Sequence, residues 1–230
     1  MSQVLLDISR LISRVRYSTP SGVDRVEMAY ARGLLGQYGD ALSFAAVHPT
    51  GLYGRIRRDS ALAYLDELER RWTQEGERPR RHSIASILPW MVRLLPQRRP
   101  PAPASCPPVY VQVSPHHLTN ARKVQHVLAR EQARFLCMVH DLIPIEFPEY
   151  ARPSGAELHR RRMQTLVTHA DAVIVNSAAT GQSFKPWIDR SGRDIAMHVA
   201  LLGTEPLAKP AEPTLTDARP YFVCIGTIEP

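Results

Sequence analysis

The sequence predicts an α/β protein in which a Rossmann-like, mostly parallel sheet is covered by helices on both faces. Short apolar runs alternate along the chain with segments whose apolar residues recur at helical spacing. The 230 residues are enough to enclose a sizeable core, and 44% hydrophobic with 22% charged residues is ordinary for a globular protein. No apolar run approaches the ~20 residues that are needed to cross a bilayer.

The expected elements follow one another along the whole chain. Strands are predicted in the apolar runs at residues 4–8, 42–47, 109–113, 135–140, 172–175, 196–202 and 221–225. Helices are predicted at residues 23–34, 60–74, 118–130, 153–169 and from 177 onward. Pro153 suits the first turn of its helix, and Ser177 is expected to cap the next one. Ligands bind beyond the carboxyl ends of the strands in such sheets, so the residues after each strand are the first candidates for a site.

Two segments interrupt this alternation. Residues 97–108 contain five prolines, which lack the backbone donor that a helix or sheet requires, so an extended loop is expected there. This loop belongs to an insertion at about residues 70–108, which carries eight arginines against two glutamates between positions 70 and 99. Residues 209–220, KPAEPTLTDARP, are typical of a linker between domains.

The turn after the first strand is a candidate ligand loop. Thr19, Pro20, Ser21 and Gly22 form a tight loop, and Ser21 and Asp24 have the spacing of a helix capping box. Such a turn directs free backbone N–H groups and the positive end of a helix dipole at the cleft, which suits a phosphate. Gly22 would let a ligand approach the backbone closely. A helix cap without any ligand explains the same residues.

The pair His140–Asp141 stands where a buried strand ends, so it is expected to project into the cleft. Histidine can donate or accept a hydrogen bond near neutral pH, which suits a sugar hydroxyl or a proton transfer. The alternative is that Asp141 caps the following turn while His140 only packs.

Later strand ends supply further candidates. Asn176 either binds a ligand or satisfies loop backbone, and we favour the second, while Ser177 is explained as a helix cap. Gly203 and Thr204 form either a cleft-facing edge or a plain turn. The pair His116–His117 lacks a third ligand at metal-like spacing, so no metal site is expected.

The three cysteines are odd in number and widely spaced, which argues against a disulfide framework and favours a reducing cytoplasm. The N-terminus MSQVLLDISRL has no basic region before a long apolar core, so we expect a first strand there and not a signal peptide.

Five segments, taken in order, resemble the family-4 glycosyltransferases. They are TPSGVDRVE at 19–27, VHDLIPIEFPEY at 139–150, ADAVIVNSAAT at 170–180, LLGTE at 201–205 and RPYFVCIGTIEP at 219–230. The resemblance covers nearly the whole chain except residues from about 55 to 108. The likeness is greatest to bacterial members that build polysaccharides, often mannosyltransferases.

The resemblance implies the GT-B fold, in which two Rossmann-like domains face each other across a cleft. It also implies transfer of a hexosyl group with retention from a nucleotide sugar, with GDP-mannose the expected donor, to a glycan or lipid-linked acceptor, without a metal or cofactor. Residues 1–208 would form the N-terminal, acceptor-side domain, and residues 221–230 the first strand of a truncated donor-binding domain. The chain alone is therefore expected to have little transferase activity.

The resemblance also assigns roles to individual residues. His140 would contact the donor sugar and help to stabilise its cationic transition state, and Asp141 would support that histidine. The loop that contains Thr19, Ser21 and Gly22 would lie near the donor phosphates. The residues that would line the cleft are Asn176, Ser177, Gly203, Thr204 and Glu229.

The segment at residues 82–99, HSIASILPWMVRLLPQRR, has apolar residues at roughly helical spacing, with Pro89 as a kink and arginines at both ends. One interpretation is a helix in a membrane interface, which would place the protein at the inner face of the plasma membrane. The other is a covered helix that packs on the domain beside a solvated basic loop.

Two further function classes were weighed against the enzyme. One is a non-catalytic module that binds a glycan or a lipid-linked sugar. The other is a nucleic-acid-binding protein, prompted by the net charge of +7 and a pI near 9.7. We expect no nucleic-acid partner, because the basic residues cluster in the insertion without an aromatic stacking motif or a recognition helix.

Overall fold

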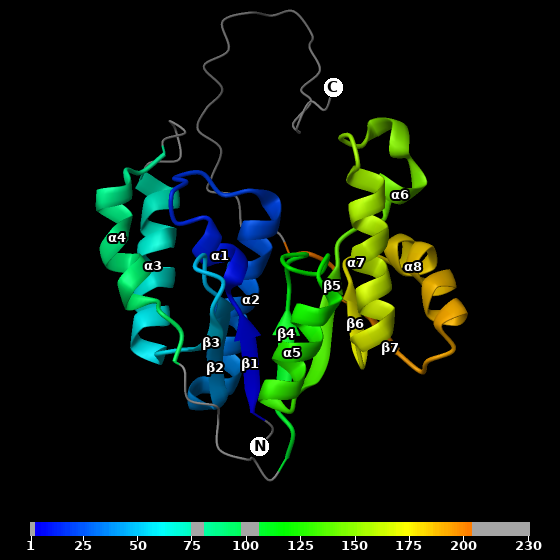
Figure 1. Ribbon diagram of the computed structural model, residues 1–230, viewed down its shortest axis with the longest axis horizontal. Coiled ribbons are helices and arrows are strands. Elements are labelled where there is room, and N and C mark those ends of the chain that lie inside the picture. The colour runs from blue at the N-terminus through cyan, green and yellow to red at the C-terminus, as the bar shows by residue number, and fades with distance from the viewer. Residues whose placement is uncertain (1–2, 75–80, 98–105, 204–230) are drawn as a thin grey trace, which may run out of the picture.

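The computed structural model describes residues 3–74, 81–97 and 106–203, which contain one seven-stranded sheet with helices on both faces (Figure 1). The strands are β1 (Val4–Asp7), β2 (Leu42–Val47), β3 (Tyr53–Ile56), β4 (Val109–Gln112), β5 (Arg134–Val139), β6 (Ala172–Val175) and β7 (Ala196–Val199). Their order across the sheet is β3-β2-β1-β4-β5-β6-β7, and every neighbouring pair is parallel except β2 and β3. The predicted Rossmann-like α/β fold is therefore confirmed.

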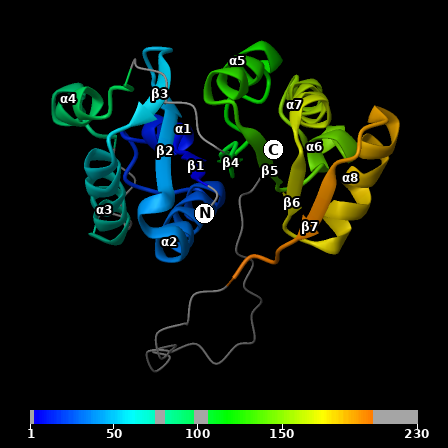
Figure 2. The same ribbon diagram turned by 90° about the horizontal axis from the view of Figure 1, so that it is seen from below.

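The helices divide between the two faces of this sheet. They are α1 (Ser9–Ser13), α2 (Gly22–Tyr38), α3 (Arg58–Gln74), α4 (Ile84–Arg93), α5 (Ala121–Glu131), α6 (Ile143–Glu146), α7 (Gly155–His169) and α8 (Ala178–Ser191). Helices α1, α2 and α3 share one core with the sheet, called here the first core. Helices α5, α7 and α8 share the second core, on the other face. Figure 2 shows α2 and α5 on opposite sides of the sheet.

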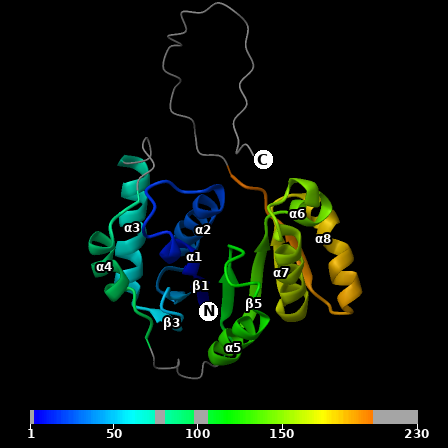
Figure 3. The same ribbon diagram turned by 45° about the horizontal axis from the view of Figure 1, so that its top comes forward.

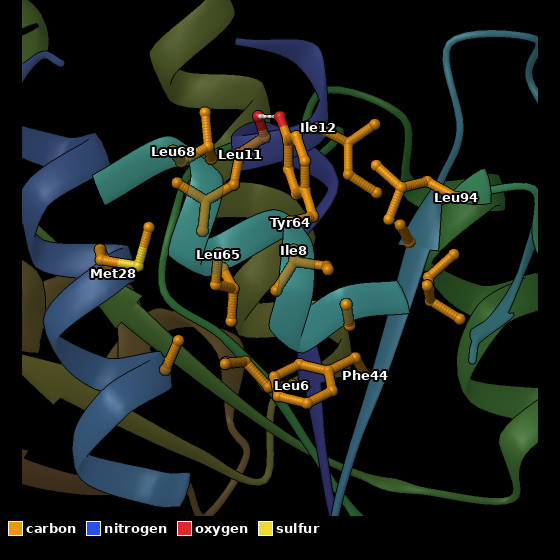
Figure 4. Close-up of a cluster of buried hydrophobic side chains, with 14 of the residues drawn as sticks. Leu6, Ile8, Leu11, Ile12, Met28, Phe44, Tyr64, Leu65, Leu68 and Leu94 are labelled. Atoms are coloured by element: carbon orange, nitrogen blue, oxygen red, sulfur yellow. Dashed lines mark hydrogen bonds between the residues drawn. The ribbon is translucent and has the colours of Figure 1, made fainter. Parts of the chain in front are cut away.

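Alternate residues of each strand supply these two cores, because successive side chains in a strand point to opposite faces. In β1, Leu6 joins the first core and Leu5 the second, and both are fully buried. In the first core the hydroxyl of Tyr64 donates to the Leu11 carbonyl at 2.8 Å, which ties α3 to α1 (Figure 4). The buried tyrosine thus satisfies its polar atom while its ring fills the core.

The order of the strands defines where a ligand site is expected. From β1 the chain moves outward to β2 on one side, and it later returns to place β4 on the other side of β1. The connections that leave β1 and β4 therefore run to opposite faces of the sheet. In open α/β sheets the crevice outside the carboxyl ends of two such strands is where ligands bind.

Several predicted boundaries differ from the observed ones for local reasons. Helix α5 begins three residues late, because the Asn120 side chain accepts the Lys123 N–H at 3.0 Å and so caps the helix there. Pro153 lies outside the first turn of α7, which begins at Gly155 after Ser154 in a left-handed conformation (φ 62°). Strand β3 and the short helix α1 were not predicted.

The buried face of α2 also differs from the expected one. The apolar residues Val26, Tyr30 and Leu34 are only partly buried, whereas Asp24 and Glu27 are fully buried. Charged residues are rarely buried unless they have partners. Their burial indicates that this part of α2 packs near the carboxyl ends of the strands as well as against the core.

A prediction concerns Gly54, where β3 passes against the segment that follows α4. The Cβ of an alanine at this position would collide with the backbone oxygen of Gln97 and lie 3.1 Å from the Pro96 Cβ. We expect Gly54→Ala to lower the free energy of unfolding by about 1–3 kcal/mol. The matched control is Gly33→Ala in α2, where nothing lies within 4 Å of the new Cβ. There urea unfolding should show a gain of about 0.5–1 kcal/mol, and equal effects of the two substitutions would contradict this packing.

Candidate functional site

The carboxyl ends of β1, β2 and β4 are tied together by a buried hydrogen-bond network. The Asp7 carboxylate accepts the N–H and the hydroxyl of Ser9, at 2.8 and 2.9 Å, and also the hydroxyl of Tyr110. The Ser9 hydroxyl in turn accepts the Val47 N–H at 2.8 Å. Burial raises the pKa of Asp7 above its usual value. This network holds the chain after β1 in one place, from which Arg10 extends toward α2.

The N-terminus of α2 is held by a capping box and two arginines. The Ser21 hydroxyl accepts the Asp24 N–H at 3.3 Å, and the Asp24 carboxylate accepts the Ser21 N–H at 2.7 Å. Arg10 reaches the same carboxylate at 2.6 Å through Nε and donates to the Ser21 hydroxyl at 3.0 Å. Arg14 lies 3.2 Å from the Asp24 carboxylate. The predicted capping box is confirmed, and two positive charges here face a single buried carboxylate.

Glu27 is fully buried one turn further along α2. Neither of its carboxyl oxygens makes a hydrogen bond of normal geometry within the described part of the chain, although the Ser114 hydroxyl lies nearby. Burial, and then the negative charge of Asp7, raise the pKa of Glu27 well above its usual value. A protonated carboxyl group can donate as well as accept a hydrogen bond. Glu27 lies within range of the charge of Asp7, at the end of β1, and near Ser114, which follows β4.

His140 follows β5 and is bound to the end of the neighbouring strand. Its Nε2 lies 2.8 Å from the Val113 carbonyl, which can only accept, so Nε2 carries the hydrogen. Burial lowers the pKa of His140 below its usual value of 6.5, so the ring is neutral at pH 7 and Nδ1 has a free lone pair. Among the described residues Nδ1 has no hydrogen-bond partner. The imidazole thus lies at the carboxyl end of β5, beside the end of β4, and is not buried in the hydrophobic interior.

The strand ends of β5 and β6 are joined through Thr180. Its hydroxyl donates to the Asn176 side-chain oxygen at 2.8 Å and reaches the His140 carbonyl at 3.5 Å. Ser177 caps α8 by accepting the Thr180 N–H at 3.1 Å, as expected. The Asn176 oxygen is therefore engaged within the protein, by the Thr180 side chain and not by the loop backbone that was expected.

Asp141 caps the turn that follows it, since its carboxylate accepts the Ile143 N–H at 3.1 Å. Its carbonyl accepts from Nε2 of His159 on α7, at 2.9 Å. The capping alternative raised from the sequence is thus present for Asp141. Its charge also acts on the His140 ring beside it.

Sequence reasoning missed Arg10 and Arg162 and set aside His116. The charge of Arg10 acts on His116, on His140 and on Arg162, so these side chains lie near one another around the ends of β1, β4 and β5. Burial, and then the like charge of Arg10, lower the pKa of Arg162, whose Nε is buried without a hydrogen-bond partner in the described residues. Burial and these cations lower the pKa of His116 to about 4.

A sequence signal for part of this cluster existed. Arg10 comes directly after the first strand, and the pair His116–His117 follows β4, which are the positions that this fold marks for ligands. The sequence could not indicate Arg162 in this way, because Arg162 lies in the middle of α7. It comes near the strand ends only because α7 packs on the sheet.

The other predicted site residues make few contacts within the described part of the chain. The Thr19 carbonyl accepts from Arg14 at 3.4 Å. Gly22 begins α2, is exposed, and has nothing within 4 Å of where a Cβ would lie, so the fold does not require glycine there. Gly203 is exposed in the same open way. Thr204 and Glu229 lie outside the described residues, as do the predicted linker and the strand at 221–225.

Within the described ranges, no group of three or more histidine, cysteine, aspartate or glutamate side chains is arranged to hold a metal ion. In the same ranges, no helix is long and apolar enough to cross a membrane.

Comparisons of the chain with protein-family models, with curated proteins and with solved structures found no match. The function must therefore be inferred from the side chains at the carboxyl ends of β1, β4 and β5 and from the five sequence segments that resemble the family-4 glycosyltransferases.

Proposed function

We propose that this chain is the acceptor-side domain of a retaining, nucleotide-sugar-dependent glycosyltransferase. The proposal includes transfer of mannose from GDP-mannose to a glycan or a lipid-linked acceptor. The observation that carries it is the meeting of arginines and neutral imidazoles at the ends of β1, β4 and β5. Cations attract a phosphate, and neutral imidazoles bind sugar hydroxyls, so the two together suit a sugar attached to a diphosphate.

In this proposal His140 binds a hydroxyl of the transferred sugar through Nδ1. Its Nε2–H is held by Val113, so the ring cannot turn away, and its neutral state leaves the lone pair available. An electron-rich nitrogen beside the sugar ring would also stabilise the positive charge that develops when the bond to the diphosphate breaks.

Arg10 and Arg162 supply the cationic side of the site in this proposal. Arg10 is held by Asp24 and Ser21, so its guanidinium is positioned before a ligand arrives. Arg162 has an Nε without a partner, and an anion between the two arginines would relieve their mutual repulsion.

The test is an amide NMR titration of the 230-residue chain with millimolar GDP-mannose, with GDP and mannose as separate titrants. We expect shifts that cluster at residues 9–24, 114–117 and 140–141, with the larger share from GDP-mannose. His140→Phe should weaken binding about tenfold, because it removes one hydrogen bond to the sugar. Binding to the unaltered chain should fall as the pH is lowered through the folded pKa of His140, below 6.5, because protonation removes the acceptor on Nδ1.

The matched control is His198→Phe, which changes an exposed histidine on β7 and should leave the affinity unaltered. Shifts on another face of the domain, or equal affinities for the two variants, would overturn the proposal. Shifts that arise with free mannosides but not with GDP-mannose would favour the non-catalytic glycan-binding module.

A further inference from the structure

Helix α4 presents an apolar stripe to solvent. Ile84 (68% exposed), Leu88 (55%) and Val92 (59%) share one face because they are four residues apart, which is close to a whole turn of a helix. Leu95 (45%), just beyond the end of α4, adds another exposed aliphatic side chain. Figures 1 and 3 show α4 at the outer side of the domain, beside α3 and away from α7 and α8. Large aliphatic side chains that gather in this way are unusual on a surface without a partner.

The opposite face of α4 holds the helix firmly on the domain. Ile87 and Leu94 are buried in the first core, and the Trp90 ring packs on Tyr64 with the ring centres 5.5 Å apart. His48 adds a contact from its Nε2 to the Met91 carbonyl at 3.1 Å. The covered-helix interpretation is therefore correct for this face, yet the same contacts prevent the stripe from rotating inward.

The charged side chains of the segment that carries the stripe are all positive. Residues 81–97 contain Arg81 and Arg93 and no aspartate or glutamate. Both arginines are exposed, and Arg16 joins them at the start of α4, where its Nε reaches the His82 carbonyl at 3.4 Å. The guanidinium of Arg93 lies 5.4 Å from the centre of the Trp90 ring, which itself packs on Tyr64.

We propose that α4 seats this domain on the surface of an anionic lipid bilayer, with the stripe among the acyl chains and the arginines at the headgroups. A helix with one exposed aliphatic face and no acidic residue fits a bilayer interface. The exposed arginines at the start of α4 and near its end complement anionic headgroups. The proposal does not depend on glycosyl transfer, because it uses a different surface from the site at the strand ends.

The test is co-sedimentation with vesicles of phosphatidylcholine that contain about one third phosphatidylglycerol, and with pure phosphatidylcholine vesicles. We expect binding to the anionic vesicles that persists when the salt concentration is raised moderately. The triple variant I84S/L88S/V92S should bind at least about tenfold more weakly, because binding scales with the apolar area inserted. The matched control is Y150S/L158S, which removes two exposed apolar side chains from η2 (Pro148–Tyr150) and α7 and should bind like the unaltered chain.

A second variant separates charge from insertion. R81E/R93E should lose binding to anionic vesicles by about tenfold or more while its thermal unfolding stays unaltered, because both side chains are exposed. Loss of all binding at moderate salt would mean charge attraction without insertion and would overturn the proposal. Absence of vesicle binding, together with a dimer that the triple variant abolishes, would assign the stripe to a second copy of this chain instead.

Discussion

Replacing Asp24 by alanine is expected to lower the free energy of unfolding by about 2–4 kcal/mol, because it removes a buried carboxylate that pairs with two partly exposed arginines and caps α2. The carboxylate is completely buried, is bonded to Arg10 at 2.6 Å and to the Ser21 N–H at 2.7 Å, and forms an ion pair with Arg14 at 3.2 Å. Without it, two arginines face each other at the start of α2, and the helix loses half of its capping box.

Urea unfolding at neutral pH measures this loss directly. The control is Asp40→Ala, which removes a fully exposed carboxylate 3.6 Å from Arg58 and should leave the stability essentially unaltered. Equal effects of the two substitutions would show that the buried cluster does not hold α2. High salt should leave the Asp24→Ala effect largely intact, because buried pairs are poorly screened.

Replacing Glu27 by glutamine is expected to stabilise the protein at alkaline pH. The unfolded chain releases the Glu27 proton near pH 4.5, whereas the folded protein retains it, because burial raises the pKa of this group well above that value. Each pH unit between 4.5 and the folded pKa therefore costs the folded state about 1.4 kcal/mol. Glutamine has nearly the same shape and carries no such proton, so this cost is absent from the variant.

The measurement is the stability difference between Glu27→Gln and the unaltered chain from pH 5 to pH 8. That difference should grow in favour of the variant as the pH rises and level off above the folded pKa of Glu27. Effects shared by both proteins cancel in the difference, including the stability lost below about pH 6.5, where His116 is protonated in the unfolded chain but stays neutral in the folded protein because its folded pKa is about 4. Parallel stability curves would mean that Glu27 is ionised in the folded protein.

Much of the fold could be predicted because the strands are apolar runs that tertiary contacts do not alter. The boundaries of β2 and β6 were predicted to the residue, and α3 was predicted within two residues of its start. Strand β3, with the sequence YGRI, was missed because it is short and carries an arginine and a glycine. Its pairing with β2 depends on contacts across the turn at 48–52, and no local pattern signals it.

The candidate site was predictable only in part. His140 was located because a polar pair follows an apolar run, and Ser21 because a capping box has a fixed spacing. Arg162 and Glu27 lie inside helices, where a single sequence cannot show which polar residues face the carboxyl ends of the strands. The burial of Glu27 reverses the usual rule that charged residues face water, so helical periodicity places it on the wrong face.

The sequence by itself determined the alternation of strands and helices, because runs of apolar side chains must leave water whichever way the elements are later arranged. Only the tertiary structure decided which strands lie beside β1, and thus where the crevice opens. It also decided which charges meet there, because Arg10 from α1, the histidines that follow β4 and β5, and Arg162 from α7 come together only when the sheet is assembled. The apolar stripe of α4 has the same origin, since Tyr64 and the first core cover one side of that helix and leave the other exposed.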